Sequence, residues 1–391
     1  MVVEMKKYLQ VFSGGFSNLE VDIDKLKEKL LKIMAIKKID GIIIGWNENR
    51  ELYRELKDFL KSYGTKLYFW LPIFSELSHY KEFNKVLDYT GKEIENFSFQ
   101  EGENFEFYCP NTIKNIENVK NIFDEKFSDY EIDGVFLDKI RYPAFSNGGK
   151  AVFSCFCPVC VEKMKKRGID VEKLKEYIDK TFENQGNNPL EIQSYKDFRY
   201  EFQDKEMNQY FQFKNDSITE KINELINFFK NKGLEVGLDT YASDISYLFG
   251  QDIIRLSEKA DFIKPMYYRK TYAPAGIPFE IQTYGELYNK KAGEFLLNII
   301  GEKDLKDNIG KEQMIKEIKY LSENLKNICV GIDFNKKENI ALSDAEYIKE
   351  VFDILEEGNS EGIVLSWDLM SIPEEHLDIF LKREEKCQEE M

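Results

Sequence analysis

Asp133-Gly134-Val135-Phe136-Leu137-Asp138 is a short apolar run with an acidic residue at each end. Runs of the same kind, rich in Val, Ile, Phe and Tyr, recur along the chain and are separated by helical patterns. Most of them are continuous and do not alternate between apolar and polar residues, which is typical of strands buried on both faces. The strands that we expect are Tyr8–Ser13, Gly41–Trp46, Lys66–Ile73, Gly134–Ile140, Leu234–Tyr241, Phe262–Tyr268, Ile328–Phe334 and Gly362–Leu369.

The segments between these strands predict helices. Ile23–Ile33 has apolar residues at helical spacing and lysines on its other face, and Ile113–Phe127 and Ile218–Asn231 are similar. Strands that alternate with helices in this way predict an α/β fold, a (β/α)₈ TIM barrel. A doubly wound open sheet is the competing interpretation. We favour the barrel because the strand count is eight and because polar residues collect where the strands end.

Two connections are longer than a minimal barrel needs. They span residues 74–108, after the third strand, and 142–231, after the fourth, and we expect both to be helical insertions on the face where the strands end. The second contains a polar linker between helices at 184–189. We therefore expect a single barrel domain over 1–382 and a charged tail over 383–391.

Composition and charge limit the partners. The 391 residues are 42% hydrophobic and 14% aromatic, which is ample for a large core, and the net charge is −16. A nucleic-acid backbone or an anionic membrane surface would be repelled by this charge, so we expect neither as a partner. No segment approaches the ~20 apolar residues of a membrane span. With no visible signal peptide and clustered cysteines, we expect a cytoplasmic protein, and its oligomeric state stays open.

Acidic residues at strand ends are the candidate catalytic groups. Asp138 follows the apolar run of the fourth strand, and Asp239 and Asp333 lie near the ends of the fifth and seventh. In a barrel enzyme such residues face the substrate. Glycoside hydrolysis needs two carboxyl groups that flank an oxocarbenium-like transition state. We take Asp138 as one member of this pair, with Asp239 as the first choice of partner and Asp333 as the second.

Aromatic and basic residues at strand ends are the candidate substrate-binding groups. Sugar rings stack their C–H faces on indole and phenol rings, and a guanidinium can bind a hydroxyl or acid group or keep a carboxylate ionised. Two alternatives stay open: the tryptophans could belong to the core, and Asp333 and Asp368 could cap the following helices. The candidates are Arg141, Trp46, Trp70, Tyr267, Trp367 and Asp368.

Other catalytic chemistries have less support. The only histidines, His79 and His376, do not end a strand, which disfavours a Ser-His-Asp triad or a His-rich metal centre. The glycines at 14–15 lack the spacing of a dinucleotide-binding loop.

Cysteines form the most specific motif of the chain. Three thiols lie within Cys155-Phe156-Cys157-Pro158-Val159-Cys160, and Cys109 lies upstream. Four thiolates close a tetrahedral zinc site and leave no position for a water, so such a metal is structural. An iron–sulfur cluster and cysteines that bind nothing are the alternatives, although unligated thiols in a polar loop would be prone to oxidation. We expect Cys329 to be a buried thiol and Cys387 to be exposed in the tail.

The segment from Asp133 to Pro143 resembles a motif of glycoside-hydrolase-like barrels of a largely uncharacterised family. In that motif Asp-Gly, three apolar residues and Asp are followed by Arg and Pro. Phe198-Arg199, which we expect in the helix after the insertion, is similar to a pattern common in these barrels. The resemblance covers most of the chain and implies a TIM barrel with Asp138 in its site. Further matching segments, in the family's order, are Lys66–Pro72, Cys109–Asn111 and Ala260–Tyr268.

The cysteine layout resembles that of family 42 β-galactosidases, in which the corresponding thiols bind a structural zinc. The resemblance implies zinc ligation by Cys109, Cys155, Cys157 and Cys160. Family 42 enzymes end the fourth strand in Asn-Glu, where this chain has Leu137-Asp138, and their nucleophile is a glutamate on the seventh strand, where the nearest candidate is Asp333. The zinc site therefore carries over better than the β-galactosidase activity.

Two hypotheses of different classes follow. The first is a glycoside hydrolase acting on a glycan or oligosaccharide through paired carboxylates at the C-terminal face of the barrel. The second is a non-catalytic barrel that binds carbohydrate or scaffolds a partner, which keeps the aromatic residues but needs no paired acids. An enzyme of another class, such as a lyase, is a third possibility.

Overall fold

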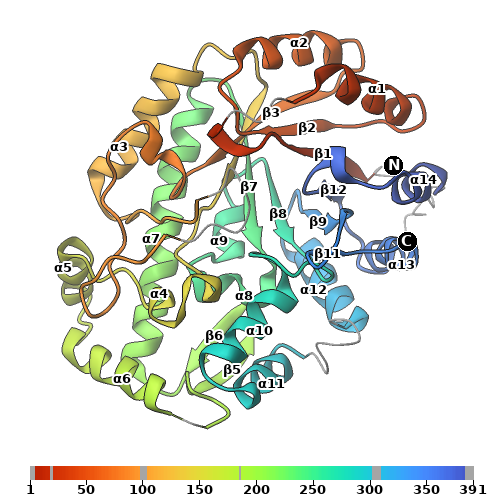
Figure 1. Cartoon of the computed structure of the whole chain (residues 1–391). Coiled ribbons are helices and arrows are strands. Elements are labelled where there is room, and N and C mark those ends of the chain that lie inside the picture. The colour runs from red at the N-terminus through yellow and green to blue at the C-terminus, as the bar shows by residue number, and fades with distance from the viewer. Residues whose placement is uncertain (1–4, 18–20, 97–103, 185, 302–309, 384–391) are drawn as a thin grey trace.

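A computed structural model describes residues 5–17, 21–96, 104–184, 186–301 and 310–383 of the chain. Its eight long parallel strands close into a barrel in the order β1-β12-β9-β8-β7-β4-β3-β2, which confirms the TIM barrel and excludes the open sheet (Figure 1). The strands are β1 (Lys6–Phe12), β2 (Gly41–Gly45), β3 (Lys66–Pro72), β4 (Gly134–Asp138), β7 (Glu235–Tyr241), β8 (Phe262–Met266), β9 (Cys329–Asp333) and β12 (Gly362–Ser366).

One long helix or helical segment follows each barrel strand and covers its outer face. Several begin at an aspartate whose side chain accepts a backbone N–H of the first turn, as Asp22 does for Lys25 and Asp344 for Tyr347. The expected helix 113–127 is an α-helix followed by a π-helical turn, Phe123–Phe127. The covering helices are α1 (Ile23–Met34), α2 (Arg50–Lys61), α3 (Ile113–Ile122), α7 (Lys205–Lys230), α9 (Ile253–Ser257), α12 (Lys311–Asn324), α13 (Ala345–Glu357) and α14 (Glu374–Lys382).

Aromatic rings fill the lower part of the barrel interior. Phe262 lies at the centre of this layer, with ring centroids 4.6 Å from Tyr8, 5.4 Å from Tyr68 and 5.8 Å from Phe136. These rings close the barrel from below, so a ligand can enter only from the end at which the strands finish. Glycine at 331 makes room above this layer, because a Cβ there would lie 2.4 Å from Cε of Lys264.

The connection after β3 differs from the helical insertion that we expected. Its described residues contain a short 3₁₀ turn, η2 (Leu77–His79), and isolated β-bridges such as Lys85 with Tyr108 and Asp88 with Ser154. The segment is therefore an extended loop that packs against the next insertion.

The insertion after β4 combines short helices with a β-hairpin. We expected Phe198-Arg199 in a helix, and this was wrong. Phe198 is in the hairpin turn, and Arg199 begins the second strand of the hairpin. Alternating burial along β6 is the pattern of a half-buried strand, and we missed this period of two. The elements are η4 (Phe145–Asn147), α4 (Gly149–Val152), α5 (Pro158–Lys166), α6 (Val171–Glu183), β5 (Ile192–Lys196) and β6 (Arg199–Phe202).

A third elaboration, which the sequence analysis did not separate, lies between β8 and α12. It contains α10 (Ile277–Leu287) and α11 (Lys290–Ile299), which pack against each other through Gly285 and Gly293. The loop that precedes α10 bridges to a small hairpin after β9, through Thr271 and Ala341. The remaining short elements are η1 (Gly15–Ser17), α8 (Ser243–Ser246), η5 (Tyr247–Phe249), β10 (Lys336–Lys337), β11 (Ala341–Leu342) and η6 (Leu369–Ser371).

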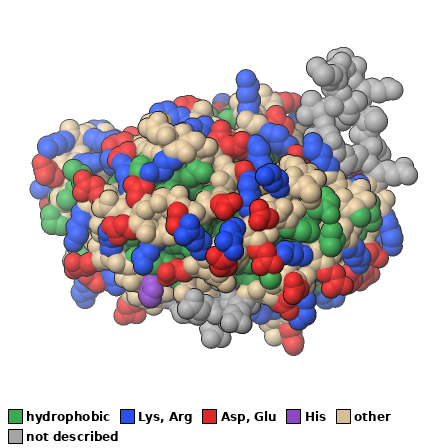
Figure 2. All heavy atoms as spheres, turned by 90° about the horizontal axis from the view of Figure 1, so that it is seen from above, with side chains coloured by type: hydrophobic (Ala, Val, Ile, Leu, Met, Phe, Trp, Pro, Cys, Tyr) green, Lys and Arg blue, Asp and Glu red, His purple; other side chains and the backbone are tan. Residues whose placement is uncertain are grey.

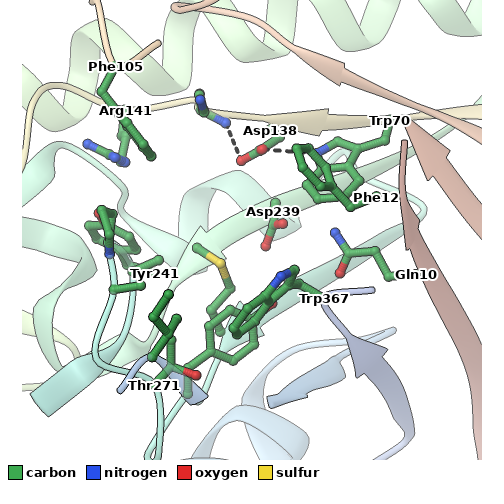
Figure 3. Close-up of a pocket in the computed structure, with 17 residues that line it drawn as sticks. Gln10, Phe12, Trp70, Phe105, Asp138, Arg141, Asp239, Tyr241, Thr271 and Trp367 are labelled. Carbon is green, nitrogen blue, oxygen red and sulfur yellow. Dashed lines mark hydrogen bonds between the residues drawn. The ribbon is translucent and has the colours of Figure 1, made fainter. Parts of the chain in front are cut away.

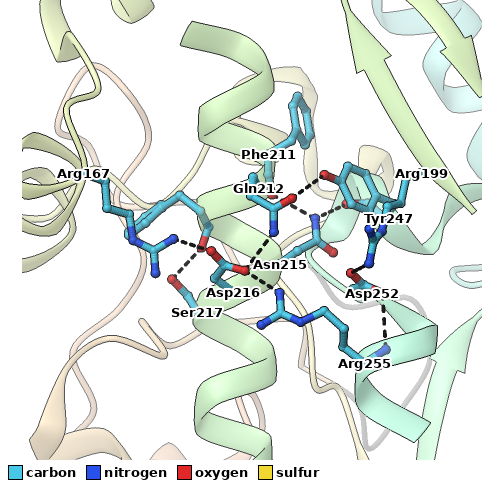
Figure 4. A network of polar contacts seen from close by, with 11 residues as sticks. Arg167, Arg199, Phe211, Gln212, Asn215, Asp216, Ser217, Tyr247, Asp252 and Arg255 are labelled. Carbon is cyan, nitrogen blue, oxygen red and sulfur yellow. Dashed lines mark hydrogen bonds and ion pairs between the residues drawn. The ribbon is translucent and has the colours of Figure 1, made fainter. Parts of the chain in front are cut away.

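A polar network ties the β4 insertion to the barrel (Figure 4). Asp216 of α7 pairs with Arg167, which follows α5, and with Arg255 of α9. Arg199 of the hairpin pairs with Asp252, the N-cap residue of α9, at 2.8 Å. Because α9 lies between β7 and β8, these pairs fix the insertion relative to the strands that carry the site.

The molecular surface carries charges of both signs. On the face shown in Figure 2, basic and acidic side chains are interspersed, and hydrophobic side chains appear only in small areas between them. Among the described residues, no helix combines the length and apolar character needed to cross a bilayer.

Candidate active site and metal centre

A pocket opens at the end of the barrel where the strands finish (Figure 3). Its cavity volume is about 100 Å³, and its mouth is open to solvent. Side chains from β1, β3, β4, β7 and β8 line it, and Trp367 joins them just after β12. The closed sheet thus brings together residues that are far apart in the chain.

Asp138 ends β4 and lines one side of the pocket. One carboxylate oxygen, Oδ2, accepts a hydrogen bond of 2.9 Å from Nε1 of Trp70, and the other accepts one from the backbone N–H of Lys139. Trp70 lies on the neighbouring strand β3, where it pairs with Phe136, two residues before Asp138. These two N–H donors fix the orientation of the carboxyl group.

Asp239 lies on β7, next to Asp138 and deeper in the barrel (Figure 3). Its Oδ2 accepts a hydrogen bond of 3.0 Å from Nζ of Lys264, whereas its buried Oδ1 has no partner in the described part of the chain. Burial raises the pKa of Asp239 to about 7, the Lys264 charge opposes this rise, and the Asp138 charge adds to it. A carboxyl group with this pKa exchanges a proton near neutral pH.

Lys264 lies behind the pocket lining and contacts three residues of it, Gln10, Asp239 and Tyr268. It is fully buried, and its ammonium donates to Asp239, to Oε1 of Gln10 at 2.9 Å and to the hydroxyl of Tyr268 at 2.8 Å. These three acceptors use all of its N–H groups. Burial lowers the pKa of Lys264, and the Asp239 charge opposes this change. Lys264 therefore holds one oxygen of Asp239, while the other oxygen is buried without a partner in the described part of the chain.

Arg141 forms the opposite wall. Its guanidinium lies between the rings of Phe107 and Tyr241, with Cζ 4.6 Å and 4.7 Å from their centroids. Its Nη1 donates to the carbonyl of Tyr142 at 2.9 Å. Phe105 lies beside it, and Figure 3 shows both on the side of the pocket away from Trp70.

Four cysteines form a second cluster outside the pocket. The Sγ atoms of Cys109, Cys155, Cys157 and Cys160 all lie within 4.8 Å of one another and are buried. Sγ of Cys109 is 3.6 Å from that of Cys157 and 3.4 Å from that of Cys160. With Zn–S bonds of about 2.3 Å, tetrahedral geometry places two sulfurs ~3.8 Å apart. The cluster therefore has the size that one metal ion requires, whereas an iron–sulfur cluster places several atoms between its thiolates.

Donors from neighbouring segments surround these sulfurs. The backbone N–H of Leu87 and Nδ2 of Asn111 each donate to a cysteine sulfur at 3.4 Å, to Cys155 and Cys160 respectively. Hydrogen bonds from neighbouring thiols, that of Cys109 first, lower the pKa of Cys157. N–H donors around thiolates are a common second layer of metal sites. Four buried cysteines in this arrangement could hold a metal ion.

Comparisons with known proteins identify the fold. No protein-family model matches the chain, and no curated protein sequence matches it. The glycoside hydrolase domain of PgaB (BpsB) from Bordetella bronchiseptica is similar in structure, with 11% identity, 96% of each chain covered and a TM-score of 0.60. The catalytic domain of a β-amylase from Paenibacillus polymyxa has 11% identity, with 97% of this chain and 98% of that chain covered and a TM-score of 0.50. The chain shares the (β/α)₈ barrel fold of these two proteins, and at these identities the likeness concerns the fold alone.

Several expected site residues do line this pocket. Asp138, Asp239, Arg141, Trp70 and Trp367 come together as the strand ends predicted. Their meeting follows from barrel closure, because each was placed at the same end of a parallel strand.

Asp333 and Tyr267, in contrast, lie outside the pocket. Asp333 is fully buried and accepts hydrogen bonds from the backbone N–H of Lys270, from Thr271 and from the hydroxyl of Tyr347. The Tyr267 hydroxyl bonds to Ser243 and Glu317 in the layer between the barrel and its helices. Since side chains alternate along a strand, Tyr268 faces the pocket in place of Tyr267.

Trp46 and Asp368 also have structural positions. Trp46 is buried against Trp70, with ring centroids 5.2 Å apart, and does not reach the pocket. Asp368 accepts from the backbone N–H groups of Met370 and Phe12 and is the N-cap residue of η6. The capping alternative is therefore the one observed for Asp368.

The residues that the sequence analysis missed include two that line the pocket, Gln10 and Phe105, and two that contact its lining, Lys264 and Phe107. Gln10 and Lys264 are polar residues inside buried strands, and such residues in an otherwise apolar run are a signal that could have been used. Phe105 and Phe107 come from the loop after β3, whose path the sequence pattern does not indicate.

Proposed function

We propose that this protein is a glycoside hydrolase that uses Asp138 and Asp239 as its pair of carboxyl groups. The observation that carries the proposal is the carboxyl group of Asp239, which has a raised pKa and one oxygen without a hydrogen-bond partner in the described residues. Its pKa of about 7 and its unpartnered Oδ1 make it a proton donor, and it borders the same pocket as Asp138. Two neighbouring carboxyl groups whose surroundings differ in this way are the arrangement of glycoside hydrolysis.

The contacts support one assignment of roles. Lys264 occupies Oδ2 of Asp239, so the proton resides on Oδ1 and passes to the glycosidic oxygen as the bond to the leaving sugar breaks. Asp138, held by Trp70 and the Lys139 N–H, faces the positive charge that develops on the sugar ring. Water then supplies a hydroxyl to the cleaved carbon and returns a proton to Asp239, which balances the hydrolysis.

The pocket walls support a sugar substrate. The rings of Phe12, Trp70, Tyr241 and Trp367 line the space around the two acids. Apolar ring faces interrupted by a few polar groups match the C–H faces and hydroxyls of a sugar.

The test is hydrolysis of a panel of oligosaccharides that differ in sugar composition and linkage. The number of reducing ends released measures the hydrolysis. We expect Asp138→Asn and Asp239→Asn each to lower kcat by about 10²-fold or more. Asp129→Asn is the matched control, because Asp129 is exposed and pairs with Arg50 on the surface. A folded Asp138→Asn protein with wild-type activity would refute the assignment. Sugar binding without turnover by the wild type would instead support a carbohydrate-binding barrel.

We further propose that the four cysteines bind one structural zinc. The closed set of sulfur ligands supports zinc, since no position is open for catalytic water. Elemental analysis should find about one zinc per chain. Cys160→Ser should lose it, whereas Cys329→Ser, which alters a buried thiol of β9 outside the cluster, should keep it. Iron in the purified protein, or zinc retained by Cys160→Ser, would contradict the proposal.

A further inference from the structure

Arg141 is a buried cation on the pocket wall without a carboxylate in contact. Its side chain belongs to a residue that is 4% exposed, and among the described residues no acid oxygen lies within 4.0 Å of its guanidinium. The other two cations of the site are paired, Lys139 with Glu76 and Lys264 with Asp239. An unpaired charge in a buried position is costly, so a partner for Arg141 is expected from outside the chain.

The donors of Arg141 are only partly used. Nη1 donates to the carbonyl of Tyr142, and this is the hydrogen bond that the guanidinium makes within the described chain. The other nitrogens have no hydrogen-bond partner in the described ranges and are accessible to solvent. Because Arg141 lines the pocket, we take their N–H groups to open on it. The rings of Phe107 and Tyr241 both lie against the guanidinium. Its unused N–H groups are the part that is available to a ligand in the pocket.

The buried acid that acts electrostatically on Arg141 already has hydrogen-bond partners. Glu280 of α10 is fully buried and accepts from the hydroxyl of Tyr241 at 3.0 Å, from the backbone N–H and hydroxyl of Ser146, and from the N–H of Ala275. Burial raises the pKa of Glu280, and the Arg141 charge opposes the rise. Glu280 therefore acts on Arg141 through space and holds Tyr241 against it, but does not fill its donors.

We propose that Arg141 binds a carboxylate of the substrate, so that the glycan carries a hexuronic acid at this position. The inference rests on the proposed function, because it takes the ligand to be a glycan. A carboxylate is planar and accepts two parallel N–H bonds from the edge of a guanidinium. A hexuronic acid presents this planar group, whereas a sulfate or phosphate ester is tetrahedral. The overall charge of −16 does not prevent this, since charges farther than ~8 Å are largely screened at physiological ionic strength.

Binding of paired ligands tests the inference. The probes are oligogalacturonate, oligomannuronate and hyaluronan oligosaccharides, each compared with its carboxyl-reduced, neutral counterpart. Titration calorimetry uses the full-length Asp138→Asn protein, which retains the pocket but does not consume the ligand. We expect at least one acidic oligosaccharide to bind about thirtyfold tighter than its neutral counterpart, the lower end of the effect of removing one partner of a buried charge pair.

Variants at Arg141 identify the group responsible. Added to the same background, Arg141→Gln should abolish the preference, and Arg141→Lys should restore part of it, since it keeps the charge but not the planar fork. Arg54→Gln, which alters an exposed arginine of α2, is the matched control and should keep the full preference. Unchanged melting temperature and metal content show that each variant is folded. If Arg141→Gln does not fold, Arg141→Lys tests the role of Arg141 by itself. Its preference for the acidic over the neutral oligosaccharide should then be smaller than that of the unsubstituted background.

The outcomes separate this inference from the proposed function. Equal binding of acidic and neutral ligands, a preference that survives loss of the guanidinium, or no binding of any acidic probe overturns the inference. Hydrolysis of neutral oligosaccharides by the wild type under those conditions leaves the hydrolase proposal standing. Selective binding of an acidic oligosaccharide that the wild type does not cleave refutes the hydrolase and retains the acid-binding site. Displacement of that ligand by inorganic sulfate as effectively as by acetate would contradict the preference for a planar group.

Discussion

Replacement of Trp70 by phenylalanine tests whether Asp138 depends on its indole donor. The substitution removes the Nε1–H that donates to Oδ2 of Asp138 at 2.9 Å and keeps an aromatic ring against Phe12 and Trp46. A hydrogen bond to a charged group contributes ~1.5–3 kcal/mol. At 1.36 kcal/mol for each factor of ten, its loss lowers kcat/KM by about 10- to 150-fold if the transition state depends on the bond.

Trp46→Phe is a closely matched control. Trp46 is the neighbouring indole, its substitution removes the same atoms, and its buried Nε1 has no hydrogen-bond partner in the described part of the chain. Both variants lose packing volume and should melt at a lower temperature. Only Trp70→Phe should also lower kcat/KM, because only Trp70 contacts the carboxylate.

The comparison of the two variants distinguishes a lost donor from general damage, because both lose packing but only one loses a hydrogen bond to Asp138. Reducing-end release at a fixed pH measures kcat/KM for each variant. If Trp70→Phe and Trp46→Phe have the same kcat/KM, the indole donor does not assist Asp138 and the proposed geometry is wrong.

Four further outcomes follow from the structure. Activity should fall as pH rises through about 7, because Asp239 must be protonated to donate, and Asp239→Asn should remove this limb together with most of kcat. Gly331→Ala should destabilise the protein by ~1–3 kcal/mol, because its Cβ displaces Lys264. Since the Lys264 charge lowers the pKa of Asp239, this displacement should move the alkaline limb of activity to higher pH. An unchanged alkaline limb would show that Lys264 does not act on Asp239. Asp333→Asn should lower the melting temperature without changing the pH profile, since Asp333 holds Thr271 and Tyr347 outside the pocket. Chelation of the metal should lower the melting temperature measured by calorimetry, and an unchanged value would exclude a structural role.

The barrel could be predicted from the sequence because its strands are buried on both faces. Continuous apolar runs such as Gly134–Asp138 and Gly362–Ser366 leave little ambiguity about a parallel sheet covered by helices. The ends of the runs were less certain. Seven of the eight expected strands extended beyond the observed ends, by two residues past Asp138 and three past Ser366. Lys139 leaves its strand with φ of 50°. Strand ends depend on tertiary contacts that a local pattern does not contain.

The candidate site was predictable only where barrel closure alone determines position. Asp138 and Asp239 follow from that rule, and so does Trp367. Tyr267 was misplaced because an error of one residue at a strand end turns a side chain to the opposite face. The pairing of Lys264 with Asp239 required the register of β7 and β8, which places the two residues opposite each other. Sequence patterns give the strands but not that register.

The metal centre and the pocket are connected through the chain itself. Cys109 ends the loop that follows β3, and the other three cysteines belong to the insertion after β4, so one ion would join the loops above two paired strands. Those strands carry Trp70 and Asp138, the donor and acceptor on one side of the pocket.

Tyr142 completes this connection on the other wall. It is fully buried beside the thiols, its backbone N–H donates to the carbonyl of Phe249, and its own carbonyl accepts from Arg141. Loosening the cysteine cluster would therefore displace Arg141 and Phe107 first. Asp239 would be less affected, because Lys264 holds it from within the barrel. A metal ion in this position would set the shape of the pocket wall that contains Arg141, whereas the position of Asp239 depends on the barrel interior. Partial loss of metal should accordingly raise KM at concentrations of chelator that leave the alkaline limb of kcat unchanged.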